Sequence, residues 1–297
     1  VHPGKTQAWS PNSQRPDDFD EACWRPEGLL LLGTPHGEGP NLGTEAPLPM
    51  GSSAIQRQLD KTLTAYTGFL QALEDVAANA PPGDPRVQTA WLLLRVCGLG
   101  RATHLLRTLP PATTAAFAAA LDEATVHAVE RLCCLDSLSE EQVHQLRLAT
   151  RNGGCGVRSH AATRGPAYLG SWLATLPAVR ARSPPGTASQ EVLQAAGTHW
   201  AAALQQATAD LEARGLFLDD DGQVKTQEPA AKWGWENGCK PLQQRQKAYS
   251  RALDAKERDA LLDRLPRADR ARLRSCGGPG AGAWLLAAPT NRTQSFE

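Results

Sequence analysis

Apolar residues recur at helical intervals through most of this chain of 297 residues. The first long series begins near Ser53, whose side chain can cap a helix, and it stops at the Pro81-Pro82-Gly83 break. Between these points the apolar residues are spaced three or four positions apart: Ile55, Leu59, Leu63, Tyr66, Leu70 and Leu73. This spacing predicts one long amphipathic helix that buries a single face.

The same pattern predicts further helices before residue 182. One begins at Asp84-Pro85 and contains Gly98 and Gly100, where the helix can kink. Another starts after Pro110-Pro111 and covers about 113–134. A serine at 137 or 139 caps the next one, which ends at a glycine signal over 152–154, and the last covers about 161–182.

The Ser183-Pro184-Pro185-Gly186 stretch is the strongest linker signal in the chain, and we place a domain boundary there. Beyond it, an amphipathic pattern predicts a long helix over 189–214 that Gly215 terminates. A small hairpin is expected over 217–224. Shorter helices are expected near 241–254, 256–265, 267–275 and 280–287.

The first 52 residues are rich in loops. Only Thr6–Ser10 and Leu29–Leu32 have the character of strands. The sequence therefore predicts a mainly α protein with a small β portion at its N-terminus. Three segments are expected: 1–52, a helical domain over 53–182, and a C-terminal helical region over 187–297.

The charge balance argues against a dedicated nucleic-acid-binding protein, because 31 basic residues face 31 acidic ones. A local basic face is still possible. Arg101, His104 and Arg107 have the spacing of one helix face, with Arg95 a short distance before them, and such a face can contact phosphates. An ordinary solvated helix surface is the alternative. The same alternative applies to the arginines over 267–274, because Asp269 lies among them and lowers their net positive charge.

The cysteines and acidic pairs give little support for a metal or disulfide site. The number of cysteines, seven, is odd and their spacing is irregular, which favours reduced thiols in an intracellular protein, nuclear or cytoplasmic. His127, Cys133, Cys134 and His144 match no common zinc pattern. No apolar run is long enough for a bilayer, so no membrane partner is expected. The Asp219-Asp220 pair resembles a two-metal motif, but it follows a helix and lies downstream of the predicted N-terminal strands, so a solvated turn is the favoured interpretation.

Several short strings together resemble non-LTR (LINE-type) retrotransposon reverse transcriptases, most closely the polymerase-derived proteins of dinoflagellates and related protists. In the N-terminal half the strings are Pro3-x-Lys-Thr-x-x-Trp9, Leu31-Leu-Gly-Thr-Pro-x-Gly37, Asp84-Pro-x-Val-Gln-Thr-Ala-Trp-Leu-Leu-Leu-Arg95 and His104-Leu-Leu-Arg-Thr-Leu-Pro-Pro111. Later strings are Gly153-Gly-x-Gly-Val-Arg-Ser159, Ala167-Tyr-Leu-Gly-Ser-Trp172 and the run from Ala271 to Leu285. They are strings of common residues rather than catalytic signatures.

The resemblance implies a role for each matching segment. Lys5 would lie near the incoming nucleotide, and Leu32-Gly33 would belong to the primer grip at the edge of the palm. Residues 53–182 would form a thumb-like helical domain against the template–primer duplex. The three metal-binding carboxylates of the family have no counterpart in this chain. The resemblance therefore implies no cofactor here, and Mg²⁺ only for the parent polymerase.

Two functions follow as hypotheses. In the first, the chain is a non-catalytic C-terminal part of an RNA-directed DNA polymerase that helps to hold an RNA or DNA template–primer duplex. In the second, it is a degenerate, non-enzymatic helical protein of a decayed retroelement that acts through protein–protein contacts. The oligomeric state is left open.

The purified chain should not extend a primer on an RNA template with deoxynucleotides and Mg²⁺, because the three metal-binding carboxylates of the family have no counterpart in it. A primer-extension gel measures this, and extension would contradict the polymerase-fragment hypothesis. The coding DNA upstream provides the companion observation. An open frame with an aromatic-x-Asp-Asp box supports the first hypothesis, and stop codons support the second.

Overall fold

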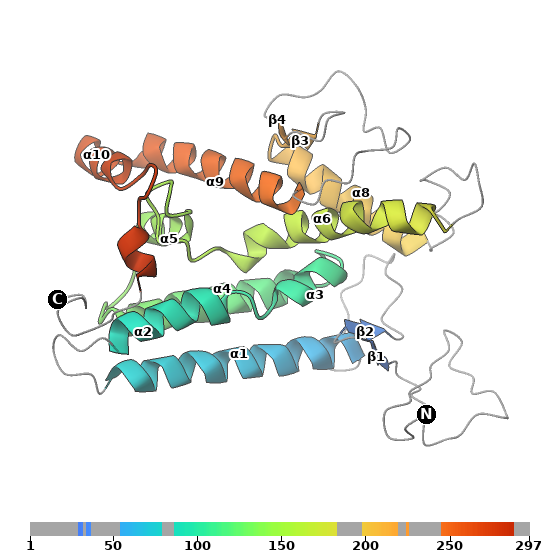
Figure 1. The fold of residues 1–297 in the computed structure, drawn as a ribbon, viewed down its shortest axis with the longest axis horizontal. Helices are drawn as coiled ribbons and strands as arrows, with labels where there is room; N and C mark the ends of the chain where they lie inside the picture. Colours follow the sequence, from blue (N-terminus) through green and yellow to red (C-terminus); the bar gives the residue numbers. More distant parts are fainter. Residues whose placement is uncertain are drawn as a thin grey trace.

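The computed structural model describes residues 29–31, 34–36, 54–78, 86–182, 198–218, 224–225 and 245–287. Within these residues the protein is mainly α-helical, as predicted from the sequence. Helix α1 (Ala54–Ala78) forms one side of the molecule, and a middle layer contains α2 (Arg86–Leu93), α3 (Thr103–Thr108) and α4 (Ala115–Leu132). Helices α6 (His160–Arg180), α8 (Thr198–Ala213) and α9 (Arg245–Arg264) lie on the other side (Figure 1).

The larger core lies between α1, the middle layer and one face of α6. The apolar residues at the predicted positions of α1 are nearly all buried here, and Leu63 packs against the core edge. Their partners on α4 include Phe117, Leu121 and Val129. Each such large side chain contributes roughly 1.5–3 kcal/mol when it is fully removed from water. Burial of one apolar face is thus what holds α1 in place.

Gly98 and Gly100 were expected to kink one helix, but the structure divides this helix into two. Residues Leu94–Gly98 form a π-helical turn after α2, and a turn then leads into α3. Gly98 is needed for close packing, because a Cβ at this position would lie 3.0 Å from the Phe69 ring on α1. The single predicted helix is therefore replaced by α2, the π turn and α3.

Helix α5 (Glu140–Arg147) starts with the capping that the sequence predicts. The Ser139 hydroxyl accepts a hydrogen bond from the Gln142 N–H (3.3 Å), and the Gln142 side chain accepts one from the Ser139 N–H (2.8 Å). Glu140 and Glu141 lie in the first turn, where the helix dipole favours negative charge. This cap sets where α5 begins and therefore where the loop before α6 runs.

A second core lies on the opposite face of α6. Tyr168, Leu169 and Leu173 of α6 pack against Leu204 and Leu211 of α8, and against Tyr249 and Leu253 of α9. Helix α6 thus has apolar contacts on both sides, with Ala167 facing the larger core. The predicted linker over 183–186 lies outside the described residues, and the boundary there stays a prediction.

A buried carboxylate connects the two parts of the molecule. Asp122 of α4 is 7% exposed and accepts hydrogen bonds from the backbone N–H groups of His160 (2.6 Å) and Ala161 (3.2 Å), at the start of α6. It also accepts from the Ser159 hydroxyl and lies 3.1 Å from His160 Nδ1. Asp122 thus accepts hydrogen bonds from the N–H groups at the start of α6. These groups have no partner within the helix and need one when they are buried.

The carboxylate is part of a larger polar network between α1, α4 and α6. The Tyr66 hydroxyl of α1 lies 2.7 Å from the Thr125 hydroxyl, which itself donates to the Leu121 carbonyl (2.6 Å). The Tyr66 ring packs edge-on against the His160 ring at 5.8 Å. At the edge of the core, the buried Glu74 of α1 and the exposed Arg131 of α4 form a two-pronged ion pair with both contacts at 2.6 Å.

The C-terminal part differs from the sequence-based prediction in two places. The helices expected over 241–254 and 256–265 are one continuous helix, α9, because residues 254–256 contain neither glycine nor proline to end it. The helix expected over 280–287 is a short 3₁₀ turn, Ala283–Leu286. Helix α10 (Arg267–Ser275) forms as predicted and packs Leu273 against Leu148 and Leu261.

Two short antiparallel pairs complete the described residues. Strand β1 (Leu29–Leu31) pairs with β2 (Thr34–His36), with Leu30 opposite Pro35. Strand β3 (Phe217–Leu218) pairs with β4 (Val224–Lys225), within the range predicted for a hairpin. The predicted strand over 6–10 lies outside the described residues. The origin of β1 and β2 in a polymerase palm stays a prediction.

Asp122→Asn should lower the free energy of unfolding by about 3 kcal/mol at neutral pH, because Asn keeps only one acceptor oxygen and places an NH2 group where Asp122 accepts hydrogen bonds. Burial alone would raise the pKa of Asp122, but the hydrogen bonds from His160 and Ser159 hold that pKa below its ordinary value. A group with a lowered folded pKa stabilises the protein above its unfolded pKa and stops doing so as the pH falls through the folded value. The difference between the variant and wild type should therefore shrink below about pH 4.

Urea unfolding between pH 3 and pH 7 measures this difference. Glu123→Gln is the matched control, since Glu123 is the next residue on α4 and its side chain is 76% exposed. An Asp122→Asn variant as stable as this control at pH 7 would contradict the assigned role.

Candidate nucleic-acid interface

The three closely spaced basic residues that the sequence singled out share an exposed surface. Arg101 lies in the turn before α3, and His104 and Arg107 lie on α3; all three are exposed, while Leu105 and Leu106 point into the core. Spacings of three residues place side chains on one face of a helix. We call these three residues the α3 strip.

The α3 strip extends onto α1. The Arg101 guanidinium stacks on the Phe69 ring at 4.1 Å from its centroid, a cation–π contact that fixes the direction of the side chain. Beside it is a hollow of about 220 Å³ to which Arg101 and Tyr66 contribute with Gln58, Lys61 and Thr62 of α1. Lys61 therefore adds a cation to the strip that the sequence pattern did not suggest.

Arg95 lies in a different environment. It belongs to the π-helical turn, and its guanidinium packs on Gly156, where a Cβ would lie only 2.5 Å from Nη2. Burial lowers the pKa of Arg95 from its ordinary value. Its Nε and Nη1 are buried and have no hydrogen-bond partner among the described residues. Arg95 thus supports the turn before α6 and is less accessible than the α3 strip.

Several predicted positions lie outside the described residues. These are Lys5, Leu32, Gly33, Asp219 and Asp220.

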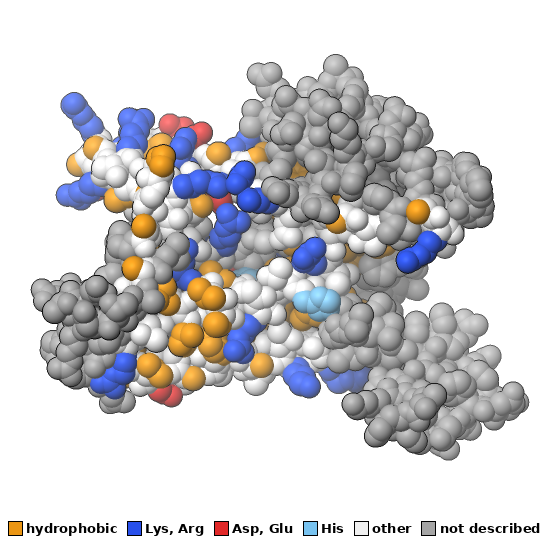
Figure 2. Space-filling model, in the orientation of Figure 1, with side chains coloured by type: hydrophobic (Ala, Val, Ile, Leu, Met, Phe, Trp, Pro, Cys, Tyr) orange, Lys and Arg blue, Asp and Glu red, His pale blue; other side chains and the backbone are white. Residues whose placement is uncertain are grey.

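The second predicted basic cluster, over 267–274, lies on α10. There Arg272 pairs with Asp269 at 2.9 Å, and Arg270 donates a hydrogen bond to the Leu265 carbonyl. Basic side chains gather over α9 and α10 in the upper left of Figure 2, and few acidic side chains are visible on this face.

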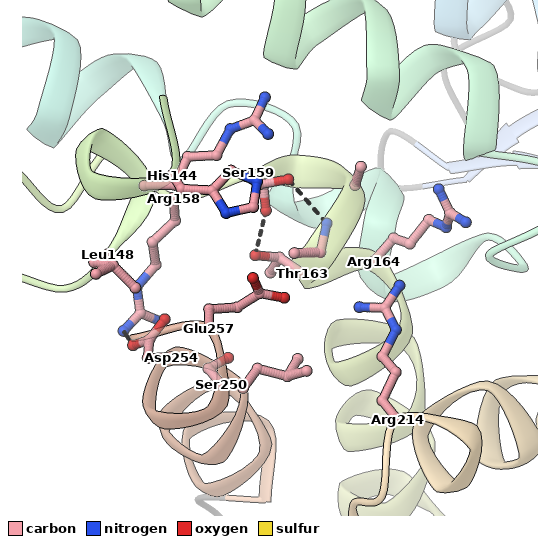
Figure 3. A pocket seen from close by; sticks show the side chains of 14 residues that line it. His144, Leu148, Arg158, Ser159, Thr163, Arg164, Arg214, Ser250, Asp254 and Glu257 are labelled. Carbon is pink, nitrogen blue, oxygen red and sulfur yellow. Dashed lines mark hydrogen bonds and ion pairs between the residues drawn. The ribbon is translucent and has the colours of Figure 1, made fainter. Parts of the chain in front are cut away.

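A pocket of about 310 Å³ lies between the end of α5, the start of α6, the residue after α8 and the middle of α9. We call it the arginine pocket. Its wall combines five basic side chains, three hydroxyl groups and two carboxylates with the apolar residues Leu148, Ala161, Ala162 and Leu253 (Figure 3). The residues that carry these groups are His144, Arg147, Arg158, Ser159, Thr163, Arg164, Arg214, Ser250, Asp254 and Glu257.

Some of the pocket's cations are already paired. Arg158 forms an ion pair with Asp254 at 3.0 Å, and Arg151 lies 3.7 Å from the same carboxylate. Burial raises the pKa of Asp254, and these two guanidinium groups offset part of that rise. Arg147 lies 3.9 Å from Asp122. These charges belong to the protein's own ion pairs.

Arg164 and Arg214 differ, because neither forms an ion pair or hydrogen bond through its guanidinium with any residue that the structure describes. Arg164 is half-buried and Arg214 is exposed. The Arg214 side chain points toward Arg164 in Figure 3. Like charges that face one cavity without counter-charges make that part of the cavity attractive for an anion. Arginine is well suited to phosphate, since its planar group presents several donors at once.

Local features of the chain hold these side chains in place. Ser159 caps α6 by accepting from the Ala162 N–H at 3.0 Å, so the first turn of α6 brings Thr163 and Arg164 to the pocket. Gly215 ends α8 with a positive φ of 66°, as the sequence predicts for a helix terminator. The Arg214 carbonyl then accepts a hydrogen bond from Lys256 Nζ at 2.6 Å, which ties this turn to α9.

One sequence signal could have indicated the pocket. Between residues 142 and 190 the chain contains no Asp or Glu but six arginines: Arg147, Arg151, Arg158, Arg164, Arg180 and Arg182. This local excess is hidden by the neutral total. Arg214 and Glu257 could not have been added from the sequence, because they come from distant segments that only the packing of α6, α8 and α9 brings together.

Other site types find no support in the described part of the chain. There, no group of three or more His, Cys, Asp or Glu side chains is arranged to hold a metal ion. No described helix combines the length and hydropathy needed to cross a membrane. Comparisons with protein-family models, curated proteins and solved structures give no match to this chain. The resemblance to reverse transcriptases stays a prediction.

Gly170→Ala should loosen the packing of α6 against α9, the two helices that carry most of the pocket's lining. A Cβ at Gly170 of α6 would lie 2.8 Å from Gln246 Cβ and 2.9 Å from the Gln246 backbone nitrogen of α9, so the two helices would have to separate. We expect a loss of about 1–3 kcal/mol in the free energy of unfolding. Gly68→Ala is the control, because this helical glycine of α1 has no neighbouring atom within 4 Å of an added Cβ.

The control should be more stable than wild type by up to about 1 kcal/mol, since alanine favours helix more than glycine does. Thermal unfolding of both variants measures the difference. Equal effects of the two substitutions would show that α6 and α9 are not packed as closely as described.

Proposed function

We propose that this chain binds the sugar-phosphate backbone of a nucleic acid without catalysing a reaction, and that it helps to hold a template–primer duplex for a polymerase. The observation that carries the proposal is the arginine pocket with its two unpaired guanidinium groups, Arg164 and Arg214. Unpaired cations inside one concave site are unfavourable for a protein alone and become favourable when phosphate binds.

The α3 strip supports the same function from a neighbouring element. Helix α3 packs directly against α6, whose first turn lines the pocket. Phosphates along a nucleic-acid strand repeat at short intervals, and a binding surface needs several cations spread along it rather than one cluster. Lys61, Arg101 and Arg107 would contact the backbone beside the strand portion that the pocket holds.

The resemblance of the sequence to LINE-type reverse transcriptases agrees with this role. In those enzymes helices downstream of the palm face the duplex, and the residues that coordinate metal lie elsewhere. In this proposal the chain contributes backbone contacts, and the catalytic carboxylates and Mg²⁺ belong to a separate polymerase portion. The binding would be largely independent of base sequence, since arginine contacts to phosphate carry no sequence information.

The double variant Arg164→Gln and Arg214→Gln should bind an RNA–DNA hybrid roughly tenfold more weakly at low salt, because two phosphate contacts are lost. The slope of log K against log salt concentration should fall in magnitude by roughly 1.4–1.8, which corresponds to two fewer released counterions. Fluorescence anisotropy across a salt series measures both quantities.

The matched control removes two positive charges elsewhere. Arg258 and Arg272 are already paired with Asp259 and Asp269 on their own helices, and Arg258→Gln with Arg272→Gln should leave the slope nearly unchanged. Absence of binding by wild type at low salt would contradict the proposed function. Equal slopes for the pocket variant and the control would show that the arginine pocket does not take part in nucleic-acid binding.

A second candidate function is contact with a protein partner. Val96 is 72% exposed on the π-helical turn, and Leu93 beside it is 38% exposed. Exposed apolar residues close together are typical of interaction surfaces. This candidate corresponds to the degenerate, non-enzymatic helical protein, and it becomes the better interpretation if wild type binds no nucleic acid.

A further inference from the structure

The arginine pocket contains acceptor groups that a simple phosphate site would not need. Glu257 of α9 lines it opposite the two unpaired arginines and extends toward Thr163 in Figure 3. The Glu257 carboxylate forms no ion pair or hydrogen bond with the described residues. The neighbouring Asp254, in contrast, is held by Arg158 at 3.0 Å. A free carboxylate in the pocket repels a bare phosphate, so it restricts which phosphate-containing ligand fits.

A second group in the wall points to the same conclusion. Ser250 lines the pocket, and its hydroxyl is open to the pocket and forms no hydrogen bond with the described residues. A ligand can therefore form a hydrogen bond with this hydroxyl. The Thr163 hydroxyl donates to the Ser159 carbonyl at 2.7 Å and keeps its own lone pairs free to accept. The pocket therefore has unused hydrogen-bonding capacity beside its unused positive charge.

A ligand that pairs with both the two arginines and the acceptor groups must carry an anionic group and, a short distance away, hydroxyl donors. Carboxylates accept hydrogen bonds and cannot donate them, so the solvent-exposed Glu257 would pair with a donor on the ligand rather than with a second acceptor. A nucleotide with a ribose sugar has this arrangement, since its 2′-hydroxyl lies close to its phosphates and a deoxyribose lacks it. A cavity of about 310 Å³ is at the lower end of the size range for small-ligand sites, which suits one nucleotide unit rather than a longer segment.

We propose that the arginine pocket holds one ribonucleotide unit, with the phosphate between Arg164 and Arg214 and the ribose hydroxyls toward Glu257 and Ser250. This inference rests on the proposed function and deepens it, because it assigns the RNA strand rather than the DNA strand to the pocket. The α3 strip has no such acceptor requirement and would contact either strand. The unit belongs to an RNA strand or to a free ribonucleotide, and the two share this chemistry.

The test compares wild type with Glu257→Ala and Ser250→Ala by anisotropy, using a single-stranded RNA and a DNA of the same sequence. Wild type should bind the RNA about tenfold more tightly than the DNA, as expected for a hydrogen bond to a charged acceptor. Glu257→Ala should reduce this ratio to near one, mainly by weakening RNA binding, and Ser250→Ala should reduce it in part. Asp263→Ala is the control, since Asp263 is an exposed carboxylate on the same helix outside the pocket, and it should leave the ratio unchanged.

Competition with AMP and dAMP separates the two sources of the ligand. Displacement of the RNA by AMP but not by dAMP indicates that the pocket accepts a free ribonucleotide, and no displacement by either indicates that the unit must belong to a strand. Equal binding of RNA and DNA that is still sensitive to Arg164→Gln and Arg214→Gln would overturn this inference and leave the proposed function standing. Absence of binding to either strand would overturn both.

Discussion

The buried carboxylate of Asp122 connects two helical units that each have their own apolar core. Apolar packing holds α1 to α4 and α6 to α8 and α9, but packing is non-directional and does not specify where α6 begins. The hydrogen bonds from the N–H groups of His160 and Ala161 to Asp122 do specify it. A carboxylate at a helix start also has a favourable interaction with the helix dipole. The position of Thr163 and Arg164 depends on this contact.

The pocket shows how a protein of zero net charge can present a strongly positive site. Acidic side chains are absent between residues 142 and 190, and the acidic groups that face the pocket arrive from α9. Asp254 forms an ion pair with Arg158, while Arg164 and Arg214 form no ion pair with the described residues, and Glu257 alone faces them across the pocket. Electrostatic attraction acts over about 8–10 Å in physiological salt, so a ligand responds to this local balance and not to the total.

Sequence reasoning succeeded where local interactions decide the structure. The Ser139 cap, the end of α8 at Gly215 and the buried face of α1 each depend on a few neighbouring residues, and each is present as predicted. It failed at one position where packing against another helix matters and at one break that the sequence does not contain. The glycines over 98–100 produce a π-helical turn and a new helix, since Gly98 must admit the Phe69 ring, and α9 continues through 254–256 because nothing there interrupts it.

The amino-acid pattern by itself determined the mainly helical class, most helix boundaries and the exposed α3 strip, because helix periodicity and capping are short-range effects. Only the tertiary structure decided the arginine pocket. Arg214 follows Arg164 by 50 residues and Glu257 follows Arg214 by 43, and no local signal relates the three. Packing of α6 against α8 and α9 brings them to one cavity, since apolar burial on both faces of α6 fixes these helices around it.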